Sequence, residues 1–326
     1  MIRNLRSLYD VGFIGLLMAV AILTLSGCGS APPKQKGPAP DQELERFNRS
    51  ARLAFDKGRD EQAANLYRKA LARAYLRDDT AAILDAQYNL AVCLLNLQSY
   101  DEALDVVRRA HTEMALANHD RTVDFLLLEA TILHRRGDLD RAWQISDQIL
   151  SDPKQPSSDI KSKTHFLRGL IASEQGDLDQ LRAAITALGQ PQQSRLRADR
   201  QELLGRLAMA EQNWDAATEA FDSAATLRRE ALDYRGMVRV VVLAGEAHKK
   251  AGRTRAAAIY YLRAGRSALW QNQLVDARQW LNQSAQLANS AGDDQIHLEA
   301  HRLLRQVKGL STTAAGGSGD QATLME

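Results

Sequence analysis

The chain has 326 residues, and its 42 basic and 40 acidic residues are scattered along its length, leaving a formal net charge of +2. A nearly balanced charge without blocks of one sign gives no indication of a nucleic-acid-binding surface.

The first 28 residues have the order of an export signal. Arg3 and Arg6 precede an apolar run from Val11 to Leu25, and small residues follow directly. A basic segment, an apolar core and small residues before a cleavage site are typical of secretory signals. A membrane-spanning helix is the alternative, but this run would extend only roughly 22 Å, against a hydrocarbon core of roughly 30 Å. We therefore expect residues 1–27 to be removed as a signal peptide.

The sequence Leu25-Ser26-Gly27-Cys28 resembles the lipobox of bacterial lipoproteins. The resemblance implies that the Cys28 thiol receives a diacylglycerol, that the bond before it is cleaved, and that the new amino terminus is acylated, for example with palmitate. Two or more acyl chains hold a protein stably on a bilayer. The residue after Cys28 is Gly29 rather than an aspartate. In a Gram-negative cell, the lack of an aspartate at this position resembles an outer-membrane sorting signal. We expect a lipid-anchored envelope protein, which in such a cell lies on the periplasmic face of the outer membrane. Anchoring to the inner membrane is the alternative.

Composition divides the rest of the chain into three parts. Residues 28–40 carry four prolines among Gly, Ser and Lys, which predicts a semi-extended tether after the lipidated cysteine that spans about 35 Å. Residues 41–308 contain only three prolines and abundant Ala, Leu, Arg, Glu and Gln, a helix-rich composition. Residues 309–326 lack apolar periodicity, and we expect a disordered tail there.

An internal repeat organises the helix-rich part. Its clearest copy contains these residues: Leu204, Gly205, Ala208, Trp214, Ala217, Phe221 and Ala224. These offsets resemble the tetratricopeptide repeat (TPR) pattern, in which small residues occupy the close crossing of two helices and a large residue fills the hole between neighbouring pairs. The resemblance covers about residues 41–308 and implies a pair of helices in each copy.

The small-residue position of the second helix recurs at a regular interval. It falls at these residues: Ala63, Ala103, Ala142, Leu181, Ala217, Ala257 and His297. The spacings are 36 to 40 residues, against about 34 for the common unit, which leaves room for longer helices or for longer connections, as around Arg77–Asp79 and Asn118–Asp120. Leu181 and His297 depart from the small-residue pattern, so the last pair is expected to be a degenerate cap. An ordinary all-α bundle is the alternative, but regular recurrence favours an all-α solenoid of about seven helix pairs.

The TPR resemblance further implies a right-handed solenoid whose first helices form a concave wall that receives a peptide or helix. The family's geometry places these candidate partner-binding residues on that wall: Arg52, Phe55, Tyr88, Leu95, Leu127, His134, Phe166, Arg206 and Met209. The N-terminal and central wall is then partly apolar and aromatic, which is typical of a partner site. The alternative for each side chain is packing between adjacent helices.

Motifs of catalysis are missing from the sequence, including a phosphate-binding loop, His-Glu-x-x-His, Gly-x-Ser-x-Gly and Cys-x-x-Cys. His297 and His301 share one helix face, but two ligands do not make a metal site. Cys93 lies in an apolar run, which predicts a small buried hydrophobe rather than a reactive thiol, and no intrachain disulfide is possible if Cys28 is modified. We expect no enzyme activity, cofactor or metal.

Two functional interpretations follow. The first is a membrane-anchored scaffold that binds another envelope protein or peptide in its concave groove, as TPR lipoproteins do in assembly, secretion or pilus-type machinery. The second is an accessory or recognition subunit of an envelope enzyme that acts on peptidoglycan or exported polysaccharide. We favour the scaffold. The identity of the partner, its pathway and the oligomeric state do not follow from the sequence.

Overall fold

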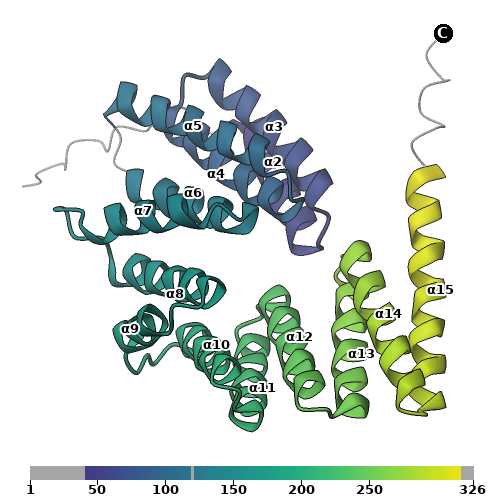
Figure 1. Ribbon diagram of the computed structural model, residues 1–326. Helices are drawn as coiled ribbons and strands as arrows, with labels where there is room; N and C mark the ends of the chain where they lie inside the picture. The colour runs from purple at the N-terminus through teal and green to yellow at the C-terminus, as the bar shows by residue number, and fades with distance from the viewer. Residues whose placement is uncertain (1–40, 119–120, 317–326) are drawn as a thin grey trace, which may run out of the picture. The chain divides into compact units, whose positions relative to one another are not determined.

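The computed structural model describes residues 41–118 and 121–316, with side chains up to residue 310. Within these residues fourteen α-helices follow one another with no strand between them (Figure 1). The part from Glu43 onward is one compact unit. The predicted signal peptide (1–27), the lipidation site Cys28 and the tether (28–40) lie outside the described residues, as does the end of the predicted tail (317–326).

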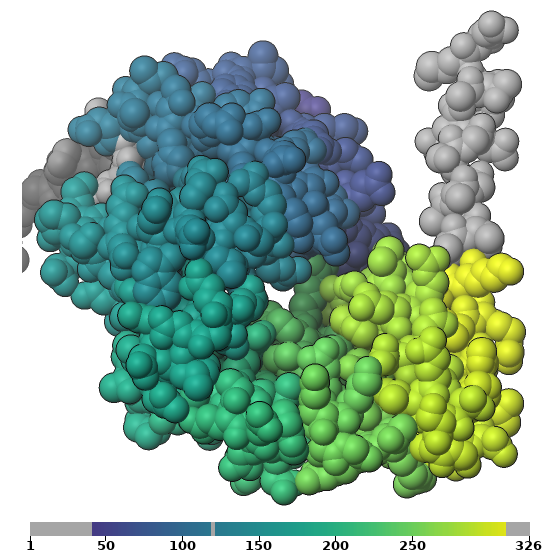
Figure 2. Space-filling view, in the orientation of Figure 1, coloured from purple at the N-terminus to yellow at the C-terminus, as the bar shows by residue number. Residues whose placement is uncertain are grey.

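The helices form seven pairs, as the repeat predicts. The first helices are α2 (Gln42–Asp56), α4 (Thr80–Asn96), α6 (Thr122–Arg136), α8 (Ser158–Gln175), α10 (Ser194–Ala210), α12 (Tyr234–Lys250) and α14 (Leu274–Ser290). The second helices are α3 (Asp60–Leu76), α5 (Tyr100–Ala117), α7 (Leu139–Leu150), α9 (Leu178–Leu188), α11 (Trp214–Glu230), α13 (Thr254–Trp270) and α15 (Asp294–Gly316). From α3 onward each helix packs on its neighbours in the chain, and α2 shares an apolar core with α3. Figure 2 shows residues 194–310, green to yellow, as a continuous band. The predicted all-α solenoid is confirmed.

The turn inside each pair has the same backbone conformation in all seven repeats. A residue with φ between 59° and 91° stands two positions before each second helix: Gly58, Gln98, Gly137, Gly176, Gln212, Gly252 and Gly292. Glycine adopts this left-handed conformation without steric cost, whereas glutamine adopts it less readily. The glycines and glutamines that recur in the sequence therefore mark the turns that reverse the chain.

The small residue of the repeat is the fourth residue of every second helix, where the two helices of a pair cross. Its side chain is 0 % exposed in six repeats: Ala63, Ala103, Ala142, Leu181, Ala217 and Ala257. In the seventh pair His297 is half-buried, and its Nδ1 atom lies 3.1 Å from the carbonyl oxygen of Ala285. The last pair therefore forms, with an imidazole and a polar contact in place of the alanine.

Glycines on the first helices make a second close approach. A Cβ atom built on Gly205 would lie 2.5 Å from the Phe221 ring, and one built on Gly169 would lie 2.4 Å from Leu203. Contacts this short are not tolerated. Gly205 and Gly169 therefore admit the large side chains of neighbouring helices, and for Gly205 the repeat pattern predicts this.

The extra length of these repeats lies in the helices rather than in the connections. Helices α3 and α4 have 17 residues each, and only Arg77, Asp78 and Asp79 separate them. Asp79 caps α4 by accepting a hydrogen bond from the amide of Ala82 at 3.1 Å. The longest connections lie in the middle of the chain, at 151–157 and 189–193, and they contain the prolines of the repeat region. Proline does not continue a helix, and the shortest helices, α7 and α9, precede these segments.

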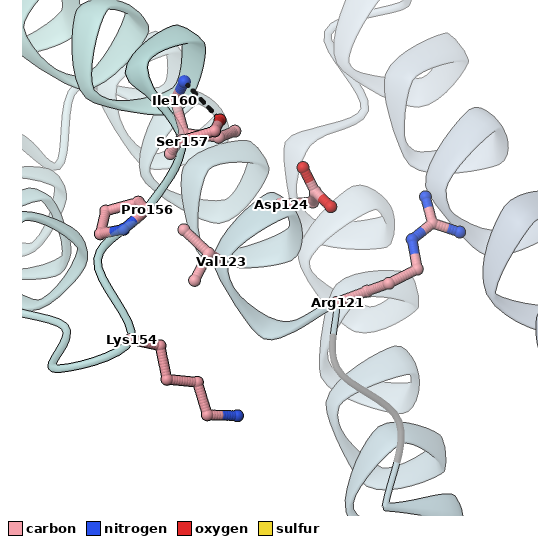
Figure 3. A pocket seen from close by; sticks show the side chains of 7 residues that line it. All are labelled: Arg121, Val123, Asp124, Lys154, Pro156, Ser157 and Ile160. Atoms are coloured by element: carbon pink, nitrogen blue, oxygen red, sulfur yellow. Dashed lines mark hydrogen bonds between the residues drawn. The ribbon is translucent and has the colours of Figure 1, made fainter.

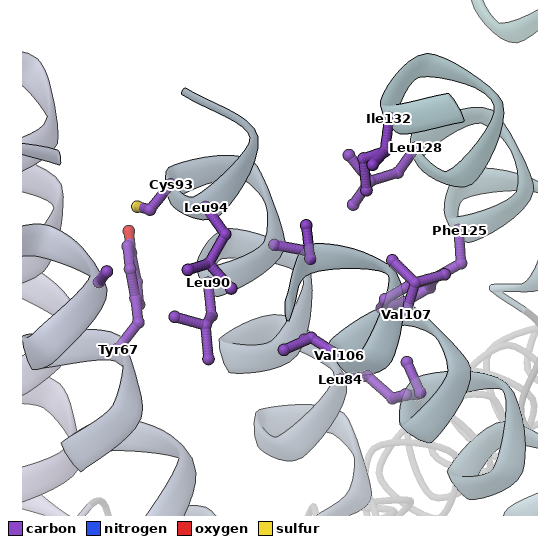
Figure 4. Packing of buried hydrophobic residues seen from close by; sticks show 14 of the residues in the cluster. Tyr67, Leu84, Leu90, Cys93, Leu94, Val106, Val107, Phe125, Leu128 and Ile132 are labelled. Carbon is purple, nitrogen blue, oxygen red and sulfur yellow. The ribbon is translucent and has the colours of Figure 1, made fainter. Parts of the chain in front are cut away.

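The N-terminal repeats share one apolar core, which includes Tyr67, Leu90, Cys93 and Phe125 (Figure 4). Cys93 is 0 % exposed, and burial raises the pKa of its thiol to about 12. A buried thiol of this kind is protonated and unreactive. The expectation that Cys93 behaves as a small hydrophobe is confirmed.

Helix α15 continues to Gly316, so residues 309–316 are helical and the prediction of a disordered tail from residue 309 onward is wrong for them. Residues Ser311 to Ala315 contain neither proline nor glycine, so nothing in this stretch stops a helix that has already formed. None of the helices in the described ranges combines the length and the apolar character needed to cross a bilayer.

We predict that Ala217→Trp destabilises the protein, because the crossing of α10 and α11 leaves no room for an indole. Overpacking a core costs about 1 to 3 kcal/mol. The free energy of unfolding, measured by denaturant titration, should fall by that amount. Glu219→Ala, on the exposed side of the same helix, is the control and should change it little. Equal effects of the two substitutions would show that the repeat frame is misplaced.

Candidate functional site

The first helices form a row of their own. Helix α6 contacts both α4 and α8, and α8 contacts α10, in addition to the contacts between helices adjacent in sequence. Residues on the same side of α4, α6, α8 and α10 therefore lie on one surface. We call this surface, together with the corresponding faces of the first helices α2 and α12, the inner wall.

An aromatic group occupies the N-terminal part of the inner wall. The Tyr88 ring on α4 meets the Phe125 ring on α6 edge to face, with 5.5 Å between the ring centroids. The guanidinium of Arg121 lies over both rings, 5.8 Å from the Tyr88 centroid and 5.9 Å from that of Phe125, and it pairs with Asp85. Burial raises the pKa of Tyr88. Tyr88 is half-buried and presents an amphipathic edge beside a cation.

Beside this group, α6 and α8 border a depression of about 240 Å³ (Figure 3). Arg121 and Asp124 line it from the start of α6, and Ser157 and Ile160 line it from the start of α8. The Ser157 hydroxyl caps α8 by accepting a hydrogen bond from the Ile160 amide at 3.3 Å. The depression therefore joins polar groups to the aromatic part of the wall.

A histidine–glutamate pair links the first helices α6 and α8. His134 Nε2 on α6 lies 3.0 Å from Glu174 Oε1 on α8, and the His134 side chain is 8 % exposed. Burial would raise the pKa of Glu174, but its contact with His134 and the nearby Arg206 outweigh burial and lower it. Glu174 is therefore an ionised group in the centre of the wall.

The C-terminal part of the wall holds a group of charged side chains with a buried centre, which we call the ionic cluster. It consists of Asp199, Glu202 and Arg206 on α10, Arg228 on α11, Asp233 in the following turn and Arg239 on α12. Three carboxylates and three guanidiniums thus meet where three helices pack. Each buried charge in the cluster has a partner of opposite sign, as it must because an unpaired buried charge is very costly.

Arg228 and Glu202 are the centres of this cluster. Arg228, 3 % exposed, donates to Asp199 at 2.9 Å, Glu202 at 2.6 Å and Asp233 at 2.6 Å. Glu202 is 0 % exposed and accepts two hydrogen bonds from Arg239, at 2.9 and 2.8 Å. The two-point Arg239 contact fixes both distance and orientation, so α10, α11 and α12 are held in one register.

The carboxylates of the cluster respond differently to their surroundings. Burial would raise the pKa of Glu202, but the guanidiniums of Arg239 and Arg228 outweigh it and hold that pKa well below its usual range. Burial would also raise the pKa of Asp233, but Arg228 and the Gly236 amide outweigh burial and lower it. For Asp199 burial prevails over Arg228, and its pKa is raised.

Gly236, in the first turn of α12, makes room for this arrangement. A Cβ atom there would lie 2.2 Å from Asp233 Oδ2 and 2.7 Å from Arg228 Nη1. Asp233 also caps α12 through the Gly236 amide at 2.9 Å. The cap, the glycine and the buried arginine therefore depend on one another.

The structure places the predicted wall residues as follows. Arg52 is exposed, and Phe55, Tyr88 and Leu95 are half-buried against the N-terminal core. Leu127 is half-buried against the core of repeats three and four, and His134 is buried against Glu174. Phe166, Arg206 and Met209 are half-buried, with Phe166 under Arg228 and Arg206 bonded to Glu202. Most of these side chains thus combine packing with partial exposure.

Sequence reasoning identified Arg206 but missed the rest of the ionic cluster. Asp199 and Glu202 stand three apart on one face of α10, among buried apolar residues. A pair of acids on a face that should be buried is the signal that could have found them.

No group of three or more His, Cys, Asp and Glu side chains with metal-binding geometry occurs within residues 41–118 and 121–310. His297 and His301 do meet, with 4.5 Å between their ring centroids.

No protein-family model matches the sequence, and no curated protein matches it. The chain is similar to solved structures that include a Rap protein complexed with Competence and Sporulation Factor (12% identity, TM-score 0.49, 82% of this chain and 98% of that one). A tetratricopeptide repeat protein from Parabacteroides merdae is also similar (14% identity, TM-score 0.43, 80% and 100%), as is BtubC from P. vanneervenii (19% identity, TM-score 0.44, 71% and 93%). Each TM-score is below 0.5, so the fold is assigned from the helices of this chain and not from these similarities.

We predict that Arg228→Leu destabilises the protein strongly at neutral pH, because three carboxylates would lose their buried partner. Removing one partner from a buried ionic group costs about 3 to 5 kcal/mol. The free energy of unfolding should show this loss, and Arg229→Leu, next to it on the exposed side, should show little.

The loss should shrink as the pH falls toward about 4. The lowered pKa values of Glu202 and Asp233 stabilise the wild type above their unfolded pKa values of about 4, and this contribution is lost as the pH falls further. Without Arg228 these carboxyls can protonate and relieve their repulsion. A loss independent of pH would contradict the charge-based explanation.

Proposed function

We propose that the protein is a lipid-anchored scaffold of the bacterial cell envelope that binds a segment of another envelope protein on its inner wall. It works by binding rather than by catalysis. The observation that carries this proposal is the row of half-buried aromatic and apolar side chains on successive first helices, above all Tyr88 and Phe166. Tyrosine and arginine, with tryptophan, are enriched among the residues that contribute most to binding at protein interfaces.

The wall offers two kinds of contact to such a segment. Tyr88 with Arg121 offers an aromatic surface beside a cation, and His134 with Glu174 offers polar groups farther along. A helical or extended segment that carries both apolar and charged residues fits this sequence of contacts. The ionic cluster fixes α10, α11 and α12, and apolar packing fixes Tyr88, so that both parts of the wall are ordered before a partner binds.

Membrane attachment rests on the lipobox-like sequence at Cys28. We predict that Cys28→Ser releases the protein from membranes or leaves it unprocessed, because the thiol is the acceptor of the lipid. Detergent partitioning and intact mass of the wild type and of the variant test this. An unmodified amino terminus in the wild type would refute the lipid anchor. It would not bear on the proposal that the inner wall binds a partner.

Binding on the inner wall predicts separate effects on affinity and stability. Tyr88→Ala and Phe166→Ala should each weaken the complex with a captured envelope partner by about 2 kcal/mol, near thirtyfold, if each residue contacts the partner. Circular dichroism melting should show that the variants remain folded. Arg141→Ala, on an exposed position of α7, is the control and should bind like the wild type.

Unchanged recovery of the partner by folded Tyr88→Ala and Phe166→Ala variants would reject the inner wall as the binding site. The second interpretation, a subunit that serves an enzyme of peptidoglycan or exported polysaccharide, predicts instead that the protein is retained on isolated cell-wall glycan.

A further inference from the structure

One ion pair joins residues that are far apart in the sequence. Arg235 Nη2, at the start of α12, lies 2.6 Å from Asp60 Oδ2, at the start of α3. The two residues are 175 positions apart, and their side chains are 30 % and 11 % exposed. An ion pair with a largely buried carboxylate is screened less by solvent than the surface pairs between adjacent repeats. It therefore connects the first repeat to the sixth.

Two neighbouring groups complete this contact. The Arg235 guanidinium carbon lies 5.7 Å from the centroid of the Phe55 ring on α2, within the range of a cation–π interaction. The second oxygen of Asp60, Oδ1, accepts a hydrogen bond from Asn96 Nδ2 on α4 at 3.1 Å. Both oxygens of the carboxylate are therefore engaged, and the cation is held on an aromatic ring.

A backbone approach next to the ion pair joins the first repeat to the connection between the sixth and seventh repeats, independently of charge. A Cβ atom on Gly58, in the turn between α2 and α3, would lie 2.3 Å from the carbonyl oxygen of Gln271, in the turn between α13 and α14. The glycine at position 58 thus serves both the turn and this approach. We call the contacts of Phe55, Gly58, Asp60 and Asn96 with Arg235 and Gln271 the clasp.

The clasp bridges two parts of the inner wall. Phe55 and Asn96 stand at the carboxyl ends of the first helices α2 and α4, whereas Arg235 stands in the first turn of the first helix α12. We propose that the clasp holds the inner wall in a closed state, and that its release gives a protein segment access to the wall. This inference rests on the proposed function, because it concerns how the same surface is regulated.

The balance of contacts favours release at this point. Successive repeats are joined by continuous clusters of buried apolar side chains, whereas the clasp consists of one ion pair, one ring contact and a few polar or backbone contacts. Regions with few buried apolar contacts open at lower free energy than the core does. A partner that binds only the open state would shift the population by its preference for that state.

Distance measurements test the clasp itself. Spin labels on Lys57→Cys and Val275→Cys, both at exposed positions, report the separation of the first and last repeats in the full-length chain carrying Cys28→Ser. Cys93 is 0 % exposed with a thiol pKa raised to about 12, so it stays unlabelled. The parent should give one short, narrow distance, and Arg235→Asp and Asp60→Arg should each give longer, broader distances. The double exchange, Asp60→Arg with Arg235→Asp, should restore the short distance.

The control breaks a more exposed ion pair between adjacent repeats, that of Asp215 with Arg253. Asp215→Arg should leave the labelled distance unchanged. Circular dichroism melting of each variant confirms that it is folded. A parent distance that does not change in the folded single variants would overturn the clasp.

Access to the wall is tested with reagents of two sizes. Thr131→Cys places a thiol on the half-buried inner side of α6, again with Cys28→Ser. A maleimide on a polyethylene glycol chain of protein-like size should react slowly in the closed parent and about tenfold faster when Arg235→Asp is added, which corresponds to about 1.4 kcal/mol. A small maleimide should react at similar rates in both.

Equal rates of the large reagent with and without the clasp would refute the closed state. Neither measurement uses a partner, so both results stand if no envelope protein is captured by the wild type. Failure of the proposed function and failure of the clasp are therefore distinguishable.

Discussion

The close crossing of two helices at the fourth residue of each second helix is the constraint on which the rest of the structure depends. Alanine at Ala103 or Ala217 has no side-chain atom beyond Cβ, and both residues are completely buried. The first helix can therefore approach closely, with Gly205 giving the same freedom from its side. Repetition of this crossing places one first helix after another in a row, and that row is the surface on which the candidate binding residues lie.

The two ends of the inner wall are ordered by different forces. Around Tyr88 and Phe125 the side chains are positioned by apolar packing and aromatic contact. Around Glu202 and Arg228 they are positioned by buried ion pairs, which add little net stability compared with apolar packing but depend strictly on geometry. We infer that the apolar end supplies adaptable contact area for a partner, while the ionic cluster holds the helices beside it in fixed register.

The sequence predicted the positions that recur in every repeat. It did not predict the ion pairs whose partners come from distant parts of the chain. The positions of Ala63, Ala142 and Ala257, and the turns at Gly58 and Gly252, recur at a fixed interval, so one good copy locates the others. Arg228 meets acids that lie 26 and 29 residues before it, and Arg235 meets one 175 residues away. No local period encodes such pairs, because they follow from how whole repeats stack. The helix beyond residue 308 was missed for a simpler reason, since a polar segment without apolar periodicity can still extend an existing helix.

Site-specific photocrosslinking in living cells tests the central claim, that the inner wall receives a protein segment, most directly. A photoreactive phenylalanine at Val92 would stand half-buried on α4, and one at Gln144 would stand exposed on the second helix α7. The account predicts that the inner position forms a discrete adduct with one envelope protein, whereas the outer position forms none. Adducts with the same protein from both positions, or from Gln144 alone, would contradict it.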